Sequence, residues 1–599
     1  MPVSLTTIAG ARDAVLHIKT ASGVVPAALW LKTESGVVLI SGSGYDIYVD
    51  AISGSDANDG TTPGKAFATL AAAQTAAVAA GDGVKIGLAR GSVWRESLQL
   101  TNLSNFTVSA YGSAELPRPT IDGADVITSW AKVAGYSNVY AITRTAPAAS
   151  SSVHYSVLIK DGSAQYGARW LLERAYATSL AASLAALDAA PGSFLIMGPS
   201  TGAFSAGNTV TIYVHAEGSG DPNVSAEYMV PTRQYCILQS DAKTGAQIYG
   251  VSAVRQLHHD GSIKVGGNCI LSDVVTAQGY IHNVFIGTGE YLDCTSDDAL
   301  KGYNVVGHSV ESPRGGLVMS GAHVTGYKIG PLYFAHGDGF NELSLIDSTA
   351  RLEAVGNCMT LCAQQRTLVR GTVATCTVPG DGRYHDYSDE YLEGAGMLVH
   401  LRDTLRWGTM LYSRTSRGSK IFIYKSRAVI DWTSLVRMYQ ADASTEVHVI
   451  GCAIREIPYA SFLIDSAAGG KLVIKHCIID QNDCSTSKPF INGYSSAVTI
   501  EADHNVYWNR AGTPTWKRNG TNITTFDWWK SFGNDANSVV ADPLWVSDPA
   551  ATPAGDFALA NWALQPSSPA IAVGAGPEHM PAGYTPPAWL PADIVAMLD

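Results

Sequence analysis

Short runs of alternating apolar and polar residues recur along the middle of the chain. Four runs share one form, in which the alternation ends at a small or polar residue: 344–348, 447–452, 472–477 and 498–503. Their last positions are 104, 25 and 26 residues apart, and 104 is four times 26. Weaker runs of the same kind fill the first interval or precede it: 270–274, 291–295, 317–322, 368–372, 397–402 and 421–426. A fixed period of this length indicates a repeat protein.

The repeats have the character of β-strands. Alternation with period two, many Val, Ile and Thr residues, and Gly or Asp-Gly between the runs all favour strands over helices. About ten repeats of roughly 25 residues then extend from near residue 250 to near 510. Parallel strands from successive repeats stack at about 4.8 Å, so that equivalent residues form interior ladders, with Cys452 over Cys477 as one candidate rung. The fold class expected is all-β, a right-handed parallel β-helix.

Other segments flank or interrupt the repeats. An Ala-rich stretch, 66–80, predicts a helix that caps the open end of the stack, with Pro63 before it and Gly81 as its stop. A later helix carries Leu180, Leu184 and Leu187 on one face, with Ser179 or Thr178 as N-cap. Strands are expected at 193–197 and 209–215. The expected division of the chain is an N-terminal adaptor (1–44), the β-helix opening with its capping helix (45–129), a β-rich insertion (130–235), the main stack (236–510) and a closing segment (511–599).

The composition and net charge restrict which classes of binding partner are expected. The chain has 599 residues, 46% hydrophobic and 15% charged, with a net charge of −12. An acidic chain is a poor ligand for nucleic acid, because phosphate binding needs a basic field. No secretion signal and no run of 18 apolar residues is visible, so neither export by a leader nor membrane insertion is expected. Nine scattered cysteines suggest buried thiols from a reducing cytosol, and no metal site is expected at Cys358 and Cys362.

The stretch from Tyr45 to Leu70 resembles the opening motif of bacterial and phage proteins with a pectate-lyase-like β-helix. Segments after the 503–508 strand, at 541–545 and 566–571, resemble the closing part of the same family. The resemblance covers roughly residues 45–575 and specifies the fold better than the chemistry. With its N-terminal module and its free cysteines as well, the chain resembles a bacteriophage tailspike or tail fibre. That resemblance implies assembly in the host cytoplasm, attachment to a phage tail or baseplate protein through the N-terminus, a homotrimer, and action on bacterial surface polysaccharide from the virion.

Asp56, Asn58 and Asp59 are similar to a calcium loop but lack its full spacing and its distal Glu. Turn chemistry is the favoured interpretation. The tryptophans late in the chain either stack on sugar rings or seal the end of the stack, and sealing is favoured.

Candidate chemistry is concentrated between residues 255 and 390, where titratable side chains are dense. Hydrolysis of a polysaccharide needs two carboxylates, whereas elimination from a uronic acid needs a base and a group that neutralises the sugar carboxylate. The candidate catalytic residues are Asp298, His336, Asp338, His385 and Asp386. The candidate substrate-binding residues are His259, Asp260, Arg314, Arg383 and Asp389. Each of these residues also has an alternative interpretation without a catalytic or binding role: an Asp-Gly corner, a solvent-exposed face or a contact between subunits.

Three functions follow from this interpretation. The leading one is a phage receptor-binding protein that cleaves polysaccharide, with hydrolysis favoured slightly over lyase chemistry. The second is a non-catalytic, glycan-binding tail fibre, and the third is a bacterial polysaccharide-degrading enzyme, against which the adaptor at 1–44 argues. No cofactor is expected, except Ca²⁺ if the reaction is that of a lyase.

Overall fold

The structure is a computed structural model. It describes residues 44–297 and 443–546 with short gaps, residues 563–590, residue 595, the strands within 16–41, and little more than the strands between 310 and 439. In the strands up to residue 41, and from residue 297 to 421, it describes the backbone and not the side chains. Strands dominate and the two largest sheets are built of parallel pairs, so the expectation of a mostly-β chain with parallel sheets is confirmed.

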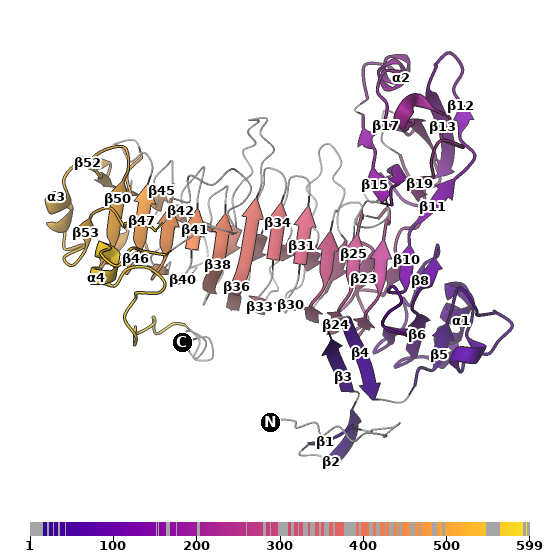
Figure 1. The fold of residues 1–599 in the computed structure, drawn as a ribbon, viewed down its shortest axis with the longest axis horizontal. Helices are drawn as coiled ribbons and strands as arrows, with labels where there is room; N and C mark the ends of the chain where they lie inside the picture. Colours follow the sequence, from indigo (N-terminus) through magenta and orange to yellow (C-terminus); the bar gives the residue numbers. More distant parts are fainter. Residues whose placement is uncertain are drawn as a thin grey trace.

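Most repeats contribute three strands, which pair in parallel with their equivalents in the neighbouring repeats (Figure 1). In two repeats one long strand, β36 (Arg366–Cys376) or β38 (Met397–Leu405), occupies both the first and the second position. The first strands are β6 (Lys85–Ala89), β9 (Thr107–Tyr111), β21 (Gln247–Tyr249), β24 (Cys269–Ser272), β27 (Gly289–Leu292), β30 (Leu317–Ser320), β33 (Glu342–Ile346), β36 (Arg366–Cys376), β38 (Met397–Leu405), β40 (Lys420–Tyr424), β43 (Glu446–Ile450), β46 (Lys471–Lys475) and β49 (Thr499–Asp503). The second strands are β7 (Val93–Trp94), β10 (Thr120–Asp122), β22 (Ser252–Val254), β25 (Val275–Ala277), β28 (Thr295–Asp297), β31 (His323–Gly326), β34 (Thr349–Leu352), β41 (Arg427–Val429), β44 (Ala453–Arg455), β47 (Ile478–Gln481), β50 (Val506–Asn509) and β53 (Val539–Val540). The third strands are β8 (Leu98–Gln99), β20 (Ile237–Leu238), β23 (Ile263–Val265), β26 (Val284–Ile286), β29 (Val310–Ser312), β32 (Tyr333–Ala335), β35 (Met359–Cys362), β37 (Tyr391–Glu393), β39 (Leu411–Arg414), β42 (Val436–Tyr439), β45 (Phe462–Asp465), β48 (Ile491–Gly493) and β51 (Trp516–Arg518). We call this arrangement the strand stack.

In several repeats from β21 onward, a tight corner joins the first and second strands. One residue there adopts a positive φ: Gly250, Asp273, Asp293, Lys425, Gly451, His476 or His504. This left-handed conformation turns the chain within one residue, and it suits Gly, Asp and Asn better than bulky residues. The residue that follows each corner points into the core, and in the described repeats it is Val251, Val274, Cys294, Cys452, Cys477 or Asn505.

Cys452 and Cys477 are neighbours in this ladder, as expected, and both are buried. The last repeat differs from the expected period. Lys475 pairs with Asp503, so the position equivalent to Cys477 is residue 505 rather than 503, and the interval is 28 residues. The Asn505 side chain caps the ladder there, since its Oδ1 accepts from Cys477 N at 2.9 Å and its Nδ2 donates to Ile474 O at 2.9 Å.

Helix α1 (Leu70–Ala80) covers the first end of the stack and buries Leu70, Ala73 and Ala77 against it. It begins four residues later than the expected start at 66. Thr69 is the N-cap, and its Oγ1 accepts from Ala72 N at 3.1 Å. Phe67 is extended instead and bridges in parallel to Val49 of β5 (Ile47–Val49). Asp56 Oδ1 accepts from Ala68 N and Thr69 N just before the helix.

The side chains of the Asp56–Asp59 loop make hydrogen bonds to the backbone. Asn58 Nδ2 donates to Ala66 O at 3.0 Å, and Asp59 Oδ1 accepts from Thr61 N at 3.0 Å. With Asp56 occupied as an acceptor for the helix start, all three side chains brace the backbone. The hydrogen bonds therefore match the turn chemistry that was favoured.

Residues 124–231 form two sheets outside the stack (Figure 1). One sheet has the order β11 (Ala124–Ile127), β19 (Tyr228–Pro231), β14 (Leu158–Lys160) and β15 (Ala168–Trp170). The other has the order β12 (Ala131–Lys132), β13 (Val139–Thr145), β18 (Thr209–His215), β17 (Ser193–Met197) and β16 (Leu172–Glu173). Helix α2 (Leu180–Asp188) begins at Ser179, whose side chain accepts from Ala182 N, as one of the two expected N-caps. We call these residues the inserted sheets.

Aromatic residues seal the far end of the stack, next to α3 (Phe526–Lys530) and the hairpin of β51 with β52 (Thr521–Ile523). The rings of Trp516 and Trp529 are fully buried and stack at 5.9 Å. Asp535 accepts from Trp529 Nε1 at 2.6 Å and from Tyr507 OH at 3.0 Å, and its burial raises the pKa of this carboxyl. Sealing therefore holds for Trp516 and Trp529, whereas Trp528 is 41% exposed.

Before residue 44, the chain forms two antiparallel hairpins, β1 (Leu16–Thr20) with β2 (Gly23–Ala27) and β3 (Leu29–Thr33) with β4 (Gly36–Ser41). The five cysteines whose side chains are described are free and buried, and burial raises the pKa of the Cys269 thiol to about 11. Among the described residues, no helix has the length and apolar character needed to cross a membrane.

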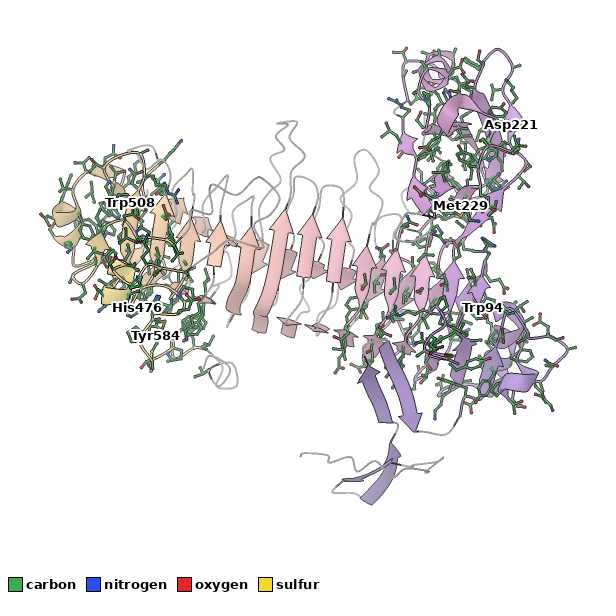
Figure 2. All side chains as sticks on the ribbon, viewed as in Figure 1. Trp94, Asp221, Met229, His476, Trp508 and Tyr584 are labelled. Carbon is green, nitrogen blue, oxygen red and sulfur yellow. The ribbon has the colours of Figure 1, made fainter. Side chains whose placement is uncertain are left out.

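Near the C-terminus, α4 (Pro569–Val573) packs against β44, β47 and β50. The segment 580–590 that follows packs against β40, β43 and β46. Trp589 Nε1 donates to Glu446 Oε2 at 2.8 Å, and the Trp589 ring contacts His448 edge-on at 5.6 Å. The Tyr584 ring lies 6.5 Å from His476, whose Nδ1 is 2.9 Å from Gly574 O (Figure 2). Burial lowers the pKa of both histidines.

These two histidines make the stability of the C-terminal end depend on pH. Their folded pKa values lie below the ordinary value near 6.5, so the unfolded chain takes up protons that the folded chain does not. Above pH 6.5 the two histidines therefore do not reduce the free energy of unfolding. Below pH 6.5 the free energy of unfolding falls as the pH drops toward the folded pKa values. His448 contributes at most about 1.4 kcal/mol per pH unit.

We expect the thermal midpoint to drop between pH 7.5 and pH 5.5, and His448→Gln to reduce that drop. His579→Gln, directly before the 580–590 segment, is the control. An unchanged pH dependence in the His448 variant would contradict the assignment.

Candidate functional site

The inserted sheets leave the stack at one corner of one repeat, between β10 and β20, near the first end of the stack (Figure 1). Backbone contacts fix this root. Gly123 O accepts from Thr232 N at 2.9 Å and from Arg233 N at 3.1 Å. A Cβ at Gly123 would lie 2.4 Å from Arg255 O, so the position has no room for a larger residue. The corner therefore holds the inserted sheets at a defined place on the stack.

A buried ion pair lies under the root. Arg255 Nε donates to Asp122 Oδ1 at 3.0 Å, and its Nη2 donates to Asp122 Oδ2 at 2.9 Å. Arg255 Nη1 also donates to Gln278 Oε1 at 3.2 Å, and Gln278 Nε2 donates to Ala168 O at 2.7 Å. Three successive repeats, those of β10, β22 and β25, are joined to the inserted sheets by this network, so its role is to hold the root together.

A second polar cluster lies beside it and contains Asp260, one of the predicted substrate-binding residues. Lys264 Nζ donates to Asp260 Oδ2 at 2.6 Å, with Asp241 3.6 Å away. The Tyr235 hydroxyl lies 2.9 Å from His258 Nδ1 and donates to Asp260 Oδ2 at 3.5 Å. Burial, and then the nearby Asp260 charge, raise the pKa of Tyr235 well above its usual range. We call this group the Asp260 cluster.

The Asp260 cluster is suited to holding charge and hydrogen bonds in place. His258 and Asp260 are each less than a tenth exposed. The Asp260 carboxylate is neutralised by Lys264, and Tyr235 keeps its proton because of its raised pKa. A Lys–carboxylate pair with a tyrosine donor can position a ligand. A general acid would instead need a carboxyl group with a raised pKa, and a carboxylate paired with a lysine is not arranged in that way.

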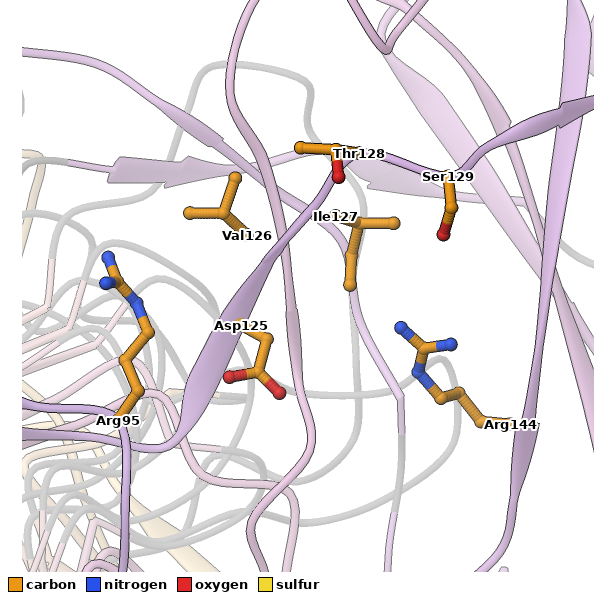
Figure 3. A pocket seen from close by; sticks show the side chains of 7 residues that line it. All are labelled: Arg95, Asp125, Val126, Ile127, Thr128, Ser129 and Arg144. Atoms are coloured by element: carbon orange, nitrogen blue, oxygen red, sulfur yellow. The ribbon is translucent and has the colours of Figure 1, made fainter.

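An open polar pocket of about 450 Å³ lies next to the root (Figure 3). Its lining comes from both parts of the molecule. Arg95 follows β7 in the stack, whereas Asp125, Thr128, Ser129 and Arg144 belong to the inserted sheets and their connections. Val126 and Ile127 complete the wall. In Figure 3, Arg95 and Arg144 lie on opposite sides of the strand that carries Asp125.

The charges in this pocket are not balanced within it. Asp125 already has its own partners outside the lining, because Arg233 Nη1 donates to Asp125 Oδ1 at 2.5 Å and Thr232 Oγ1 donates to Asp125 Oδ2 at 2.7 Å. Arg144 Nη1 donates to the backbone oxygen of Thr143 at 3.0 Å. The pocket therefore presents two guanidinium groups and two hydroxyl groups beside a carboxylate that is already paired.

The short segment 232–236 connects the pocket to the Asp260 cluster. Thr232 and Arg233 bind Asp125, and Tyr235 contacts His258 and Asp260. The Tyr235 backbone oxygen also accepts from Ser97 Oγ at 2.6 Å, two residues after Arg95. Pocket and cluster thus form one continuous polar region at the root, which we take as the candidate site.

Most of the predicted site residues lie outside the described residues: His259, Asp298, Arg314, His336, Asp338, Arg383, His385, Asp386 and Asp389. Of the ten, Asp260 is the one with a described side chain, and it lies in the Asp260 cluster. Tyr235, Lys264 and the pocket residues were not among the candidates. Their sequence signal is weak, because Arg95, Asp125 and Arg144 are isolated charges in separate strands and loops.

No protein-family model matches the sequence. No curated protein matches it either. Among solved structures, a complex of XylC with xylose covers 83% of this chain and 86% of its own, with 12% identity and a TM-score of 0.39. A GH136 lacto-N-biosidase from Eubacterium ramulus covers 83% and 67%, with 11% identity and a TM-score of 0.31. The Gp54 tailspike of Acinetobacter baumannii bacteriophage AP22, solved with A. baumannii capsular saccharide, covers 71% of each chain, with 9% identity and a TM-score of 0.16. Likenesses at this level carry no argument about the fold or activity of this chain.

The ion pair in the Asp260 cluster can be tested directly. Asp260→Ala leaves Lys264 with a distant partner in a largely buried place, so we expect a loss of about 2–4 kcal/mol in stability. Asp241→Ala removes the more exposed carboxylate at 3.6 Å and should cost less than about 1 kcal/mol. Thermal unfolding and hydrogen exchange of residues 232–265 would measure both, and equal effects would argue against a buried Lys264–Asp260 pair.

Proposed function

We propose that the strand stack is a right-handed parallel β-helix and that the chain is a tailspike-type receptor-binding protein of a bacteriophage. In this proposal it binds bacterial surface polysaccharide and cleaves it, with hydrolysis favoured over elimination. The observation that carries the proposal is the continuous polar region at the root of the inserted sheets, set on a long rigid stack. A polysaccharide is a long polar ligand with hydroxyl groups and, often, charges, and such a region offers fixed partners for both.

The assembly belongs to the proposal as well. We place the adaptor at 1–44, the opening and cap at 45–129, the insertion at 130–235, the main stack at 236–510 and the closing segment at 511–599. The adaptor would join a phage tail or baseplate protein, and three chains would associate in the virion. The free, buried cysteines are in keeping with assembly in the host cytoplasm before action at another cell surface.

Hydrolysis would require two carboxyl groups on either side of the scissile bond, one as acid and one as base or nucleophile. Asp298 and Asp338 are the leading pair, with His336, His385 and Asp386 as further candidates. The polar region at the root would then bind the chain of sugars beside the reacting bond. A lyase would use a base instead and would leave an unsaturated uronate.

The test incubates the full chain with surface polysaccharides from candidate host bacteria, following reducing ends and the absorbance of unsaturated uronates. We expect new reducing ends without absorbance, and a loss of about 100-fold or more in Asp298→Ala and in Asp338→Ala. Asp527→Asn, exposed on α3 at the far end, is the control. Absorbance would instead indicate a lyase, and retention of polysaccharide without cleavage would leave a glycan-binding fibre. Neither binding nor cleavage across the panel would overturn the proposal.

Removal of residues 1–44 separates a virion protein from a free bacterial enzyme. We expect the shortened chain to keep its action on polysaccharide but to be missing from assembled phage particles, as measured by its abundance in purified virions. Normal incorporation of the shortened chain would contradict the adaptor assignment.

A further inference from the structure

The geometry points to an anionic sugar as the occupant of the pocket at the root, and we propose that Arg95 and Arg144 hold a uronic-acid residue of the polysaccharide between them, with its carboxylate on one of the two guanidinium groups. This inference rests on the proposed function and adds the substrate class and the residues that select it.

The charge balance of the pocket is the first argument. The chain as a whole carries a net charge of −12 and therefore repels a polyanion. The pocket is an exception, since it presents two arginines. The one carboxylate in the lining, that of Asp125, is paired with Arg233, so the positive charges outnumber the negative ones there. An anionic ligand would supply the missing negative charge.

The second argument is the chemistry of the lining. Guanidinium groups match a carboxylate in a planar, two-bonded geometry, which a lysine does not reproduce. Thr128 and Ser129 add hydroxyl groups that can donate to or accept from sugar hydroxyls. A volume of about 450 Å³ lies within the usual range for small-ligand sites, and the pocket is open to solvent.

The third argument is that the pocket is built in advance. Asp125, Val126 and Ile127 are held in β11 by antiparallel pairing with β19. Arg144 lies in β13, which pairs with β18 over seven residues, and Arg95 directly follows β7, which pairs with β10. Because the backbone on both sides is fixed by sheets, a ligand would pay little to order the site.

The first experiment uses ligand-detected NMR on the full chain with sodium D-glucuronate, and D-glucose as the neutral probe, both at millimolar concentration. We expect glucuronate to bind in preference to glucose, and the affinity to fall about tenfold or more in Arg95→Ala and in Arg144→Ala. Arg144→Lys should restore only part of the affinity. Arg174→Ala, an exposed arginine elsewhere in the inserted sheets, is the matched control and should have no effect. Equal signals for the two sugars, or no binding of glucuronate, would overturn the inference.

A second experiment separates this inference from the proposed function. A host polysaccharide containing uronic acid is compared before and after chemical reduction of its carboxyl groups. We expect weaker binding to the reduced polymer, and a higher KM with little change in kcat in the arginine variants if the polymer is cleaved. Equal action on both polymers would sink the inference and leave the proposed function standing. Binding of glucuronate in the pocket without any action on host polysaccharide would sink the proposed function instead.

Discussion

Register between neighbouring repeats is the constraint on which the rest of the structure depends. Each strand is only two to five residues long in most repeats and has almost no stability alone, so its backbone hydrogen bonds must come from the repeats above and below. That requirement explains the corners. A residue at positive φ, such as Asp273 or His476, lets the chain change direction without losing register with its neighbour. The residue after the corner is then forced into the core, which is why Val274, Cys294 and Cys477 occupy one line although their chemistry differs.

A stack of this kind must also be stopped at both ends, because an uncovered repeat exposes its core and its unpaired strand edges. The two ends use different solutions. At the first end, α1 brings three small or apolar side chains onto the core and Asp56 secures the start of that helix. At the other end, Asn505 accepts from the backbone of Cys477 and Asp535 accepts from Trp529 and Tyr507, while Trp516 and Trp529 close the core. A buried carboxyl is acceptable there because several donors surround it.

The sequence was sufficient for features that depend on local pattern, and insufficient for features that depend on contacts across the fold. Period and alternation located the strands, and Ser179 before three spaced leucines located α2. The same local reading placed the start of α1 at 66, because it could not see that Phe67 pairs with Val49. It also placed the last anchor at 503 rather than 505, because two additional residues in that repeat change the period without changing the alternation. For the site, a search for dense titratable residues reached Asp260 but could not reach Arg95, Asp125 and Arg144, which lie as far as 49 residues apart and meet only through the root.

The root itself shows why a binding region would arise at this place in the fold. Joining two extra sheets to one corner of a stack buries backbone and side-chain polar groups that need partners, and Arg255–Asp122 and Lys264–Asp260 supply them from inside. These pairs are saturated and are therefore structural in the first instance. In the pocket just outside these pairs the arginines have no such partner in Asp125, because the Asp125 carboxylate is already paired with Arg233. The two arginines of the pocket thus face solvent beside a rigid, polar wall. The charged side chains that form ion pairs inside the protein hold the root together. The charged side chains that face solvent beside it are the ones able to select a ligand.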